Sequence, residues 1–197
     1  MSATSPDDFE RAASARLREL ASLATSVADA LSGEIARAAV MVRDTLASGG
    51  TLFFCGNGGS AADAQHLATE YVVRYMRERR ALPAIALTTD SSLLTAAAND
   101  LGFEHVFERQ IEALVKRGDL VVIHSTSGNS PNVILAARAA RNKAARVLAL
   151  SAGDGGTLKS VADLTILVPT SRTDRAQEIH LCIQHAICEL VEDWAAK

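Results

Sequence analysis

Five short apolar runs, rich in β-branched residues and separated by helix-like segments, constrain the fold of this chain more than any other feature. They are TLFFC (51–55), AIAL (84–87), DLVVIHS (119–125), RVLALS (146–151) and DLTILVP (163–169). Strands that alternate with helices indicate a parallel sheet covered by helices on both faces. The sequence therefore predicts an α/β fold.

The first 48 residues follow a helical pattern instead. Between Pro6 and Leu46, apolar residues recur at three- and four-residue steps. The pair Ser32–Gly33 predicts a break into two helices. Two amphipathic helices that precede a complete sheet need a surface to pack against, and we expect a partner subunit to provide it. We expect a single domain over residues 1–197, in which the helices of 1–48 serve oligomerisation and 49–197 form the sheet-containing core.

Composition excludes several classes of protein. The chain has 197 residues, is 48% hydrophobic and 22% charged, and carries a net charge of -3, as one soluble globular domain would. With a pI of about 5.9 and interspersed charges, it lacks the basic patch that nucleic-acid binding requires. The polar N-terminus and the absence of an apolar run of roughly 20 residues argue against a membrane segment and for the cytoplasm.

The three cysteines, Cys55, Cys182 and Cys188, are an odd number without CxxC spacing, and each lies in an apolar run. This usage argues against a disulfide framework or a cysteine zinc site. We expect buried thiols in a reducing compartment.

Two polar loops follow predicted strands, GNGGS (56–60) after the first and STSGNS (125–130) after the third. In open parallel sheets, ligands bind beyond the carboxyl ends of the strands, so both loops should reach one crevice. The second loop has four hydroxyl groups, with Ser130 as the predicted N-cap of a helix and Pro131 at its first position. Hydroxyls around a helix N-terminus suit a phosphate, although an ordinary capped turn has the same composition.

The loop GNGGSA also matches a dinucleotide fingerprint, G-x-G-x-x-A. That fingerprint requires an acidic residue about 20 positions on, at the end of the second strand. The helix after the loop is predicted to continue to about Arg80, and the first acidic residue after the second strand is Asp90, which is too distant. The chain also lacks the GxxxxGK[ST] pattern of a P-loop.

His66 and Glu70 lie four residues apart, on one side of the helix predicted after the glycine loop. Such a pair can bind a metal ion or transfer protons, although surface pairs without function share the spacing. The C-terminal helix supplies a second polar cluster. Gln177 lies about 80° from His185 and about 60° from His180 in the opposite sense. Spacing alone leaves open which histidine shares a site with Gln177.

Four segments together resemble the phosphoheptose isomerases, also called sedoheptulose 7-phosphate isomerases, of the sugar isomerase (SIS) superfamily. They are GNGGSAADAQHLATE (56–70), TAAANDLGFEHVF (95–107), STSGNS (125–130) and DRAQEIHLCIQH (174–185). The resemblance implies a three-layer α/β/α SIS domain with a five-stranded parallel sheet and an N-terminal helical extension. It also implies a homotetramer with active sites at subunit interfaces.

The activity that the resemblance implies is aldose–ketose isomerisation of a small-molecule sugar phosphate. Sedoheptulose 7-phosphate would become D-glycero-D-manno-heptose 7-phosphate through an enediol, in the first step of nucleotide-activated heptose biosynthesis. The exchange needs a base that moves a proton between C1 and C2 and an acid that serves the two oxygens.

The roles known in the family are assigned only to residues of this sequence that match the family pattern. The resemblance places one Zn²⁺ per subunit on His66, Glu70, Gln177 and His185, with Glu70 also as general base and His185 as general acid; His180 is then structural. It assigns the phosphate to Ser125, Thr126, Ser127 and Ser130, and the rest of the sugar to Asn57, Gly58, Ser60, Asp100, Asp174 and Gln177.

Three positions depart from the family pattern. Thr69 stands where an acidic residue often precedes the glutamate, His124 replaces an aliphatic or small residue, and Ala176 replaces a larger aliphatic residue. No predicted ligand is lost, but another heptulose phosphate is possible as the substrate.

Two other functions fit the SIS superfamily. One is a non-catalytic protein that binds a partner such as a replication initiator, and the other is a domain that only senses sugar phosphates. The partner-binding subgroup lacks the residues that match Glu70 and His185, and a sensor needs neither of them. Because this chain has both, the isomerase is favoured.

Overall fold

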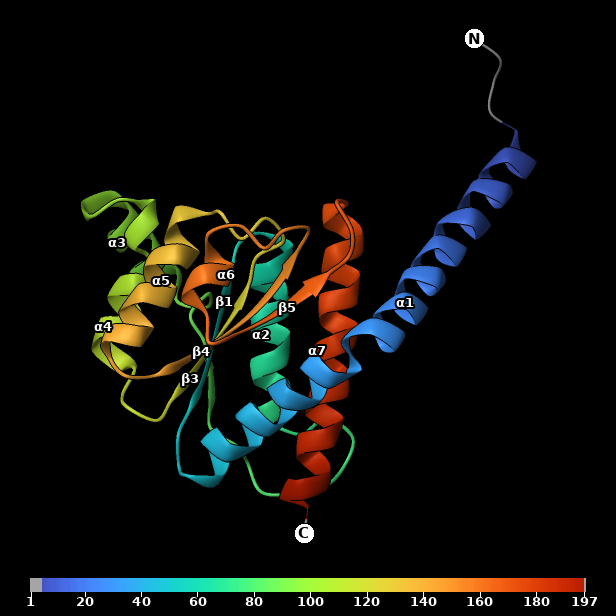
Figure 1. Cartoon of the computed structure of the whole chain (residues 1–197). Helices are drawn as coiled ribbons and strands as arrows, with labels where there is room; N and C mark the ends of the chain where they lie inside the picture. Colours follow the sequence, from blue (N-terminus) through green and yellow to red (C-terminus); the bar gives the residue numbers. More distant parts are fainter. Residues whose placement is uncertain (1–4, 197) are drawn as a thin grey trace.

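A five-stranded parallel sheet lies between two layers of helices in the computed structural model, which describes residues 5–196 (Figure 1). The strand order is β2-β1-β3-β4-β5, and all neighbouring strands are parallel. Each strand begins and ends within one residue of its predicted run. The strands are β1 (Leu52–Gly56), β2 (Ala84–Ala86), β3 (Leu120–His124), β4 (Arg146–Ala152) and β5 (Leu164–Val168).

Helices cover both faces of the sheet, which confirms the predicted three-layer α/β/α fold. One face carries α2 (Gly59–Val72), α7 (Thr173–Ala195) and the C-terminal part of α1 (Pro6–Ala47). The other carries α3 (Ser91–Asp100), α4 (Glu108–Leu114), α5 (Pro131–Asn142), α6 (Leu158–Val161) and the 3₁₀ helix η1 (Phe103–His105).

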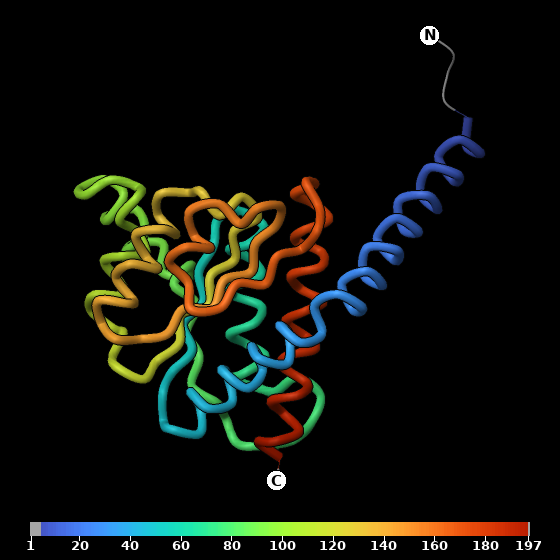
Figure 2. The backbone as a smooth tube through the Cα atoms, viewed as in Figure 1, coloured from blue at the N-terminus to red at the C-terminus, as the bar shows by residue number. Residues whose placement is uncertain are grey.

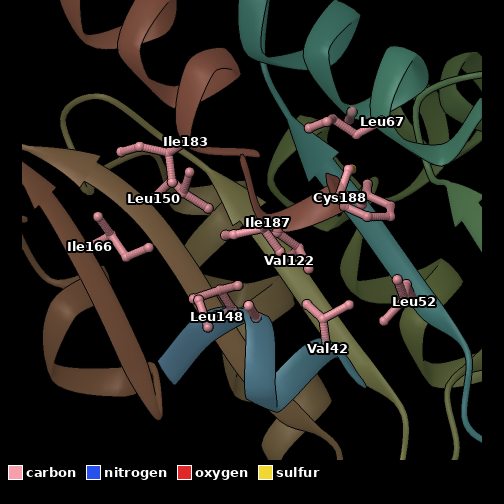
Figure 3. Close-up of a cluster of buried hydrophobic side chains, with 14 of the residues drawn as sticks. Val42, Leu52, Leu67, Val122, Leu148, Leu150, Ile166, Ile183, Ile187 and Cys188 are labelled. Carbon is pink, nitrogen blue, oxygen red and sulfur yellow. The ribbon is translucent and has the colours of Figure 1, made fainter. Parts of the chain in front are cut away.

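Along the three central strands, β1, β3 and β4, side chains alternate between the two cores, as the two-residue period of a strand requires. In β1, Leu52 and Phe54 join the core under α1, α2 and α7, whereas Phe53 and Cys55 join the opposite core. Figure 3 shows Ile183 and Ile187 of α7 against Val122 and Leu150 of the central strands. This packing fixes α2 and α7 on the same face of the sheet.

The N-terminal region is one continuous helix of 42 residues, so the predicted break at Ser32–Gly33 is wrong. A glycine inside a helix costs only about 1 kcal/mol relative to alanine. The apolar pattern runs through the pair, from Leu31 and Ile35 to the buried Ala38 and Val42, and outweighs this cost. The helix changes direction partway, which a Ser–Gly pair permits, and its N-terminal half extends away from the rest of the chain (Figure 2).

The helix after the glycine loop ends at Val72, so the predicted extension to about Arg80 is also wrong. Two buried side chains account for the early end. The guanidinium of Arg79 donates hydrogen bonds to the carbonyls of Glu70, Tyr71 and Val73. The carboxylate of Glu192 in α7 accepts hydrogen bonds from the backbone N–H groups of residues 75–77. These groups satisfy the backbone polar atoms that a longer helix would have paired internally.

The predicted burial is correct for two of the three cysteines. Cys55 and Cys188 are buried, but Cys182 is exposed, because it lies on the outer side of α7. No helix among residues 5–196 is long and apolar enough to cross a membrane.

Candidate active site

The two predicted ligand loops meet where the strand order reverses. β1 and β3 are neighbours in the sheet, but the chain runs from β1 outwards to β2 and from β3 outwards to β4 and β5. At such a switch point the following loops separate to opposite faces and leave a crevice for a ligand. The loop at Asn57 follows β1 and the loop at Ser125 follows β3. The two loops therefore follow neighbouring strand ends, at Gly56 and His124, on the same edge of the sheet, as predicted.

A pair of side-chain amides joins these loops. Asn57 and Asn132 exchange two hydrogen bonds, with N···O distances of 2.9 and 2.8 Å. Asn132 lies in the first turn of α5 and is 2% exposed. Asn132 is not among the site residues predicted from the sequence, although its place in the first turn of a helix that follows a ligand loop is a signal for such a role.

Close packing holds the beginning of α2 against α7. A Cβ atom at Gly59 would lie 2.6 Å from Oε1 of Gln177, so the Gln177 side chain in its present position lies directly against this glycine. The predicted sugar contacts Gly58 and Ser60 flank Gly59; Gly58 is the N-cap of α2, and Ser60 is buried at 3% exposure.

The STSGNS loop is ordered by its own polar groups. The hydroxyl of Ser125 accepts a hydrogen bond from the N–H of Gly128, and the hydroxyl of Ser127 accepts one from the N–H of Asn129. Ser130 is the N-cap residue of α5, as predicted, but its hydroxyl makes no capping hydrogen bond. The Ser130 hydroxyl and the N-terminus of α5 therefore have donors that a ligand can use.

A hollow of about 240 Å³ lies between this loop and the loops after β4 and β5. Its polar lining includes Thr126 and Ser127 from the STSGNS loop, Asp154, Thr170, Ser171 and Arg172 from the other two, and Thr173 at the start of α7. Hydroxyl groups thus face one space at the carboxyl edge of the sheet.

His66, Glu70 and His185 form a compact group whose ligand atoms all lie within 4.8 Å of one another. Nε2 of His66 lies 3.0 Å from Nε2 of His185 and 3.1 Å from Oε1 of Glu70. Helix α2 supplies two of these side chains and α7 supplies the third. Two imidazoles and one carboxylate are a common donor set for zinc and other divalent transition metals. The residues therefore fit a metal ion.

Burial and neighbouring charges lower the pKa values of two predicted site residues, His185 and Asp174. Burial holds the pKa of His185 below its usual value, and the neighbouring His66 lowers it further. Hydrogen bonds from Arg172 lower the pKa of Asp174 to about 2. Arg172 also pairs with Glu19, so α1 contacts the start of α7 at this edge.

Gln177, a predicted metal ligand, and Asp100, a predicted sugar contact, lie apart from the group of His66, Glu70 and His185. Gln177 packs against Gly59, eight residues before His185, which is about 12 Å along the axis of α7. Asp100 ends α3 on the opposite face of the sheet, where it accepts a hydrogen bond from Asn99. Figure 1 shows α3 and α7 on opposite sides of the molecule.

His180 lies outside the group, as predicted for a structural residue. It is fully buried, and its Nε2 lies 3.1 Å from the carbonyl oxygen of Ser151. His124, at the end of β3, is also buried and contacts the Gln184 amide at 3.1 Å. Both imidazoles support the packing of α7 on the sheet.

The sequence of this chain is similar to that of known proteins over most of its length. Residues 17–152 match the family model of the SIS domain. A phosphoheptose isomerase of Geobacter sp. (strain M21) is 53% identical over 178 residues, which cover 90% of this chain and 93% of the relative.

Two solved structures extend the comparison to the fold. A phosphoheptose isomerase from Neisseria gonorrhoeae has a TM-score of 0.89 and 40% identity, covering 94% of this chain and 99% of its own. One from Francisella tularensis has a TM-score of 0.90 and 32% identity, covering 94% of this chain and 98% of its own. On its sequence and its fold, the chain belongs to the phosphoheptose isomerase family of SIS-domain proteins.

Proposed function

We propose that this chain converts sedoheptulose 7-phosphate to D-glycero-D-manno-heptose 7-phosphate, the first step towards nucleotide-activated heptose. Its relatives carry the name phosphoheptose isomerase. The observation that carries the proposal is the group of His66, Glu70 and His185, because it holds a base and an acid a few ångströms apart. A domain that only binds a partner or senses a sugar has no use for this pair.

The phosphate of the substrate would bind Ser125, Thr126, Ser127 and Ser130. The free donors at the N-terminus of α5 favour an anion there without a lysine. Asn57, Gly58, Ser60, Asp174 and Gln177 would hold the sugar hydroxyls. His66 lies about 10 Å along α2 from Gly59, a span comparable with an extended sugar phosphate. The reacting carbons would then lie beside Glu70 while the phosphate remains in the loop.

Proton transfer would use the two side chains that the compact group brings together. The Glu70 carboxylate would take a proton from C2 of the aldose or from C1 of the ketose and return it to the other carbon. His185 would move a proton between the oxygens of the same two carbons, which completes an enediol pathway. Nε2 of His66 lies 3.1 Å from Oε1 of Glu70 and 3.0 Å from Nε2 of His185, and so orients both side chains.

The proposed metal is zinc, on His66, Glu70, Gln177 and His185. When bound, it supplies a Lewis acid that polarises the substrate oxygens. A carboxylate that ligates a metal is a weaker base than a free one. As a ligand Glu70 would help the metal to order the site, and as a free carboxylate it would act as the base. Gln177, about 12 Å from His185 along the axis of α7, is the proposed ligand that lies outside the compact group.

We further propose a homotetramer with active sites at subunit interfaces. Phe9 and Leu17 are 65% and 69% exposed on the half of α1 that extends away from the chain, where a second copy would cover them. Asp100 ends α3, on the face of the sheet opposite α2 and α7, and would complete the site of a partner subunit. Light scattering tests the assembly: a monomeric mass for the active protein would exclude it. The cytoplasmic location stays a prediction from the sequence.

The test of function is incubation of the purified protein with sedoheptulose 7-phosphate, with a chelator and with added zinc, while NMR follows the aldose product. A manno-heptose 7-phosphate that disappears on chelation and returns with zinc supports both the reaction and the metal. If the chelator does not change the amount of product, the chain is an isomerase whose mechanism does not require zinc. No product from an assembled protein under any metal condition would contradict the proposed reaction.

A further inference from the structure

The segment between α2 and β2 places an aromatic ring against one of the proposed metal ligands. The rings of Tyr75 and His185 stack with centroids 5.2 Å apart and planes at 24°. We propose that Tyr75 is a positioning residue, which holds the His185 imidazole so that its Nε2 faces His66 and Glu70. The inference rests on the metal site of the proposed function and adds a residue outside its ligand set.

The backbone of Tyr75 is fixed by a buried carboxylate. Oε1 of Glu192 accepts a hydrogen bond from the N–H of Tyr75 at 3.0 Å, and Oε2 accepts two more from Met76 and Arg77 at 2.7 and 2.8 Å. Glu192 is 2% exposed. Hydrogen bonds to a buried charged acceptor are among the stronger ones in proteins. The segment is therefore held to α7 at the residue whose ring stacks on His185.

The spacing along α7 explains why one segment meets both side chains. Seven residues separate His185 from Glu192, which is two helical turns and returns to within about 20° of the same direction. The face of α7 that presents His185 to α2 therefore also presents Glu192. Tyr75 contacts this face at both levels, with its backbone at Glu192 and its ring at His185.

A buried arginine extends the arrangement to the other helix of the site. Arg79 is 1% exposed at its side chain, pairs with Glu192 at 3.4 Å, and donates hydrogen bonds to the carbonyls of Glu70 and Tyr71. Glu192 thus connects the end of α2, which carries Glu70, with α7, which carries His185. The distance between the two proposed ligands is set partly by this pair.

The ring of Tyr75 limits the orientation of the His185 imidazole from one side, and the ring of His66 limits it from another. The centroids of His66 and His185 are 5.1 Å apart, with planes at 50°. Because His185 is only half-buried, removal of the tyrosine ring would open other side-chain rotamers to it. Residues that orient a metal ligand typically change metal affinity 10- to 100-fold when they are lost.

The experiment measures the dissociation constant for zinc of the full-length protein, by competition with a chelating dye and without substrate. Tyr75→Phe keeps the ring, Tyr75→Leu removes it, and Tyr75→Met is a second ring-free variant whose flexible side chain fills the space. Phe103→Leu is the matched control, since Phe103 is an aromatic residue 60% exposed in η1, on the far face of the sheet. Thermal melting of each variant reports whether the fold is retained.

We expect the Leu and Met variants to bind zinc about tenfold more weakly, and the Phe variant and the Phe103 control to stay within about twofold of the wild type. Wild-type affinity in a folded ring-free variant would overturn the proposal. So would an equal loss in the Phe variant, because the hydroxyl rather than the stacked ring would then be responsible.

Measurements on the same samples distinguish a failure of the proposed role of Tyr75 from a failure of the proposed reaction. If the wild-type protein takes up no zinc, the role of Tyr75 fails together with the metal site. Product formation from sedoheptulose 7-phosphate, measured in parallel, still decides whether the chain is an isomerase. Glu192→Gln adds an independent readout: hydrogen exchange at the amides of Met76 and Arg77 should accelerate as zinc affinity falls. Unchanged exchange and affinity in that variant would overturn the role of Glu192.

Discussion

The side-chain amides of Asn57 and Asn132 bond to each other twice across the switch point of the sheet, at 2.9 and 2.8 Å. Each amide offers a donor and an acceptor, so the pair satisfies both groups on both sides at once. One residue follows β1 and the other begins α5. The pair therefore sets the spacing between the proposed sugar-binding and phosphate-binding loops.

Asn132→Ala removes both bonds and leaves the Asn57 amide without its partner. We expect a loss of about 1–3 kcal/mol in the free energy of unfolding and a higher KM, because the two loops are no longer held together. Urea unfolding and initial rates measure the two effects. Asn142→Ala, at the exposed end of the same helix, is the control. Equal stability and KM in the Asn132 variant and the control would show that the amide pair is dispensable.

Glu70→Gln keeps the size of the side chain and removes its basicity. We expect kcat to fall by about 100- to 10,000-fold, the usual contribution of a general base, while the assembly and binding of inorganic phosphate persist. Turnover by NMR and light scattering are the measurements. Glu78→Gln, an exposed glutamate in the segment after α2, should retain full activity. A Glu70 variant that turns over normally would exclude this carboxylate as the base.

Arg172→Gln removes the hydrogen bonds that hold the carboxylate of Asp174. The pKa of Asp174 should rise from about 2 towards the ordinary 3.8, because the depression comes first from Arg172. The group titrates between about pH 2 and 4 in either case, so its charge at pH 7 stays the same. Any change in KM at pH 7 then reports lost orientation of Asp174.

Carboxyl-carbon NMR titration of Asp174 follows that shift directly. Arg141→Gln, which removes the Asp163 ion pair elsewhere on the surface, is the control. A pKa for Asp174 that stays near 2 in the Arg172 variant would contradict the assigned cause.

Two buried imidazoles should make the fold sensitive to acid. Burial lowers the pKa of His124 to about 3 and that of His180 to about 4. As the pH falls below the unfolded value of about 6.5, the unfolded chain binds protons that the native state does not, so stability is lost. At pH 5 the loss is about 2 kcal/mol for each imidazole.

Urea unfolding between pH 7.5 and 5 measures this dependence. His124→Gln keeps an amide opposite Gln184 and removes one titrating group, so it should remove about half of the pH dependence. A variant with an unchanged pH dependence would show that other groups are responsible.

The sequence by itself determined the order of elements, the parallel sheet and the two loops at its carboxyl edge. These features follow from local signals, since β-branched runs, glycine punctuation and the Ser130–Pro131 cap act within a few residues. It also placed His66 and Glu70 on one side of a helix, because the helical period fixes neighbours four residues apart.

Only the tertiary structure decided what depends on contacts between distant segments. The helical period left both His180 and His185 possible beside Gln177, and the packing of α7 on α2 brings His185 to His66 and buries His180 against Ser151. The predicted break in α1 and the predicted length of α2 were wrong for the same reason. Apolar residues on both sides of Gly33, among them Val27 and Ala38, pack in the core of the folded chain. Glu192, more than a hundred residues away in the sequence, accepts hydrogen bonds from the backbone after α2. No local pattern contains such contacts, because their residues meet only after the chain has folded.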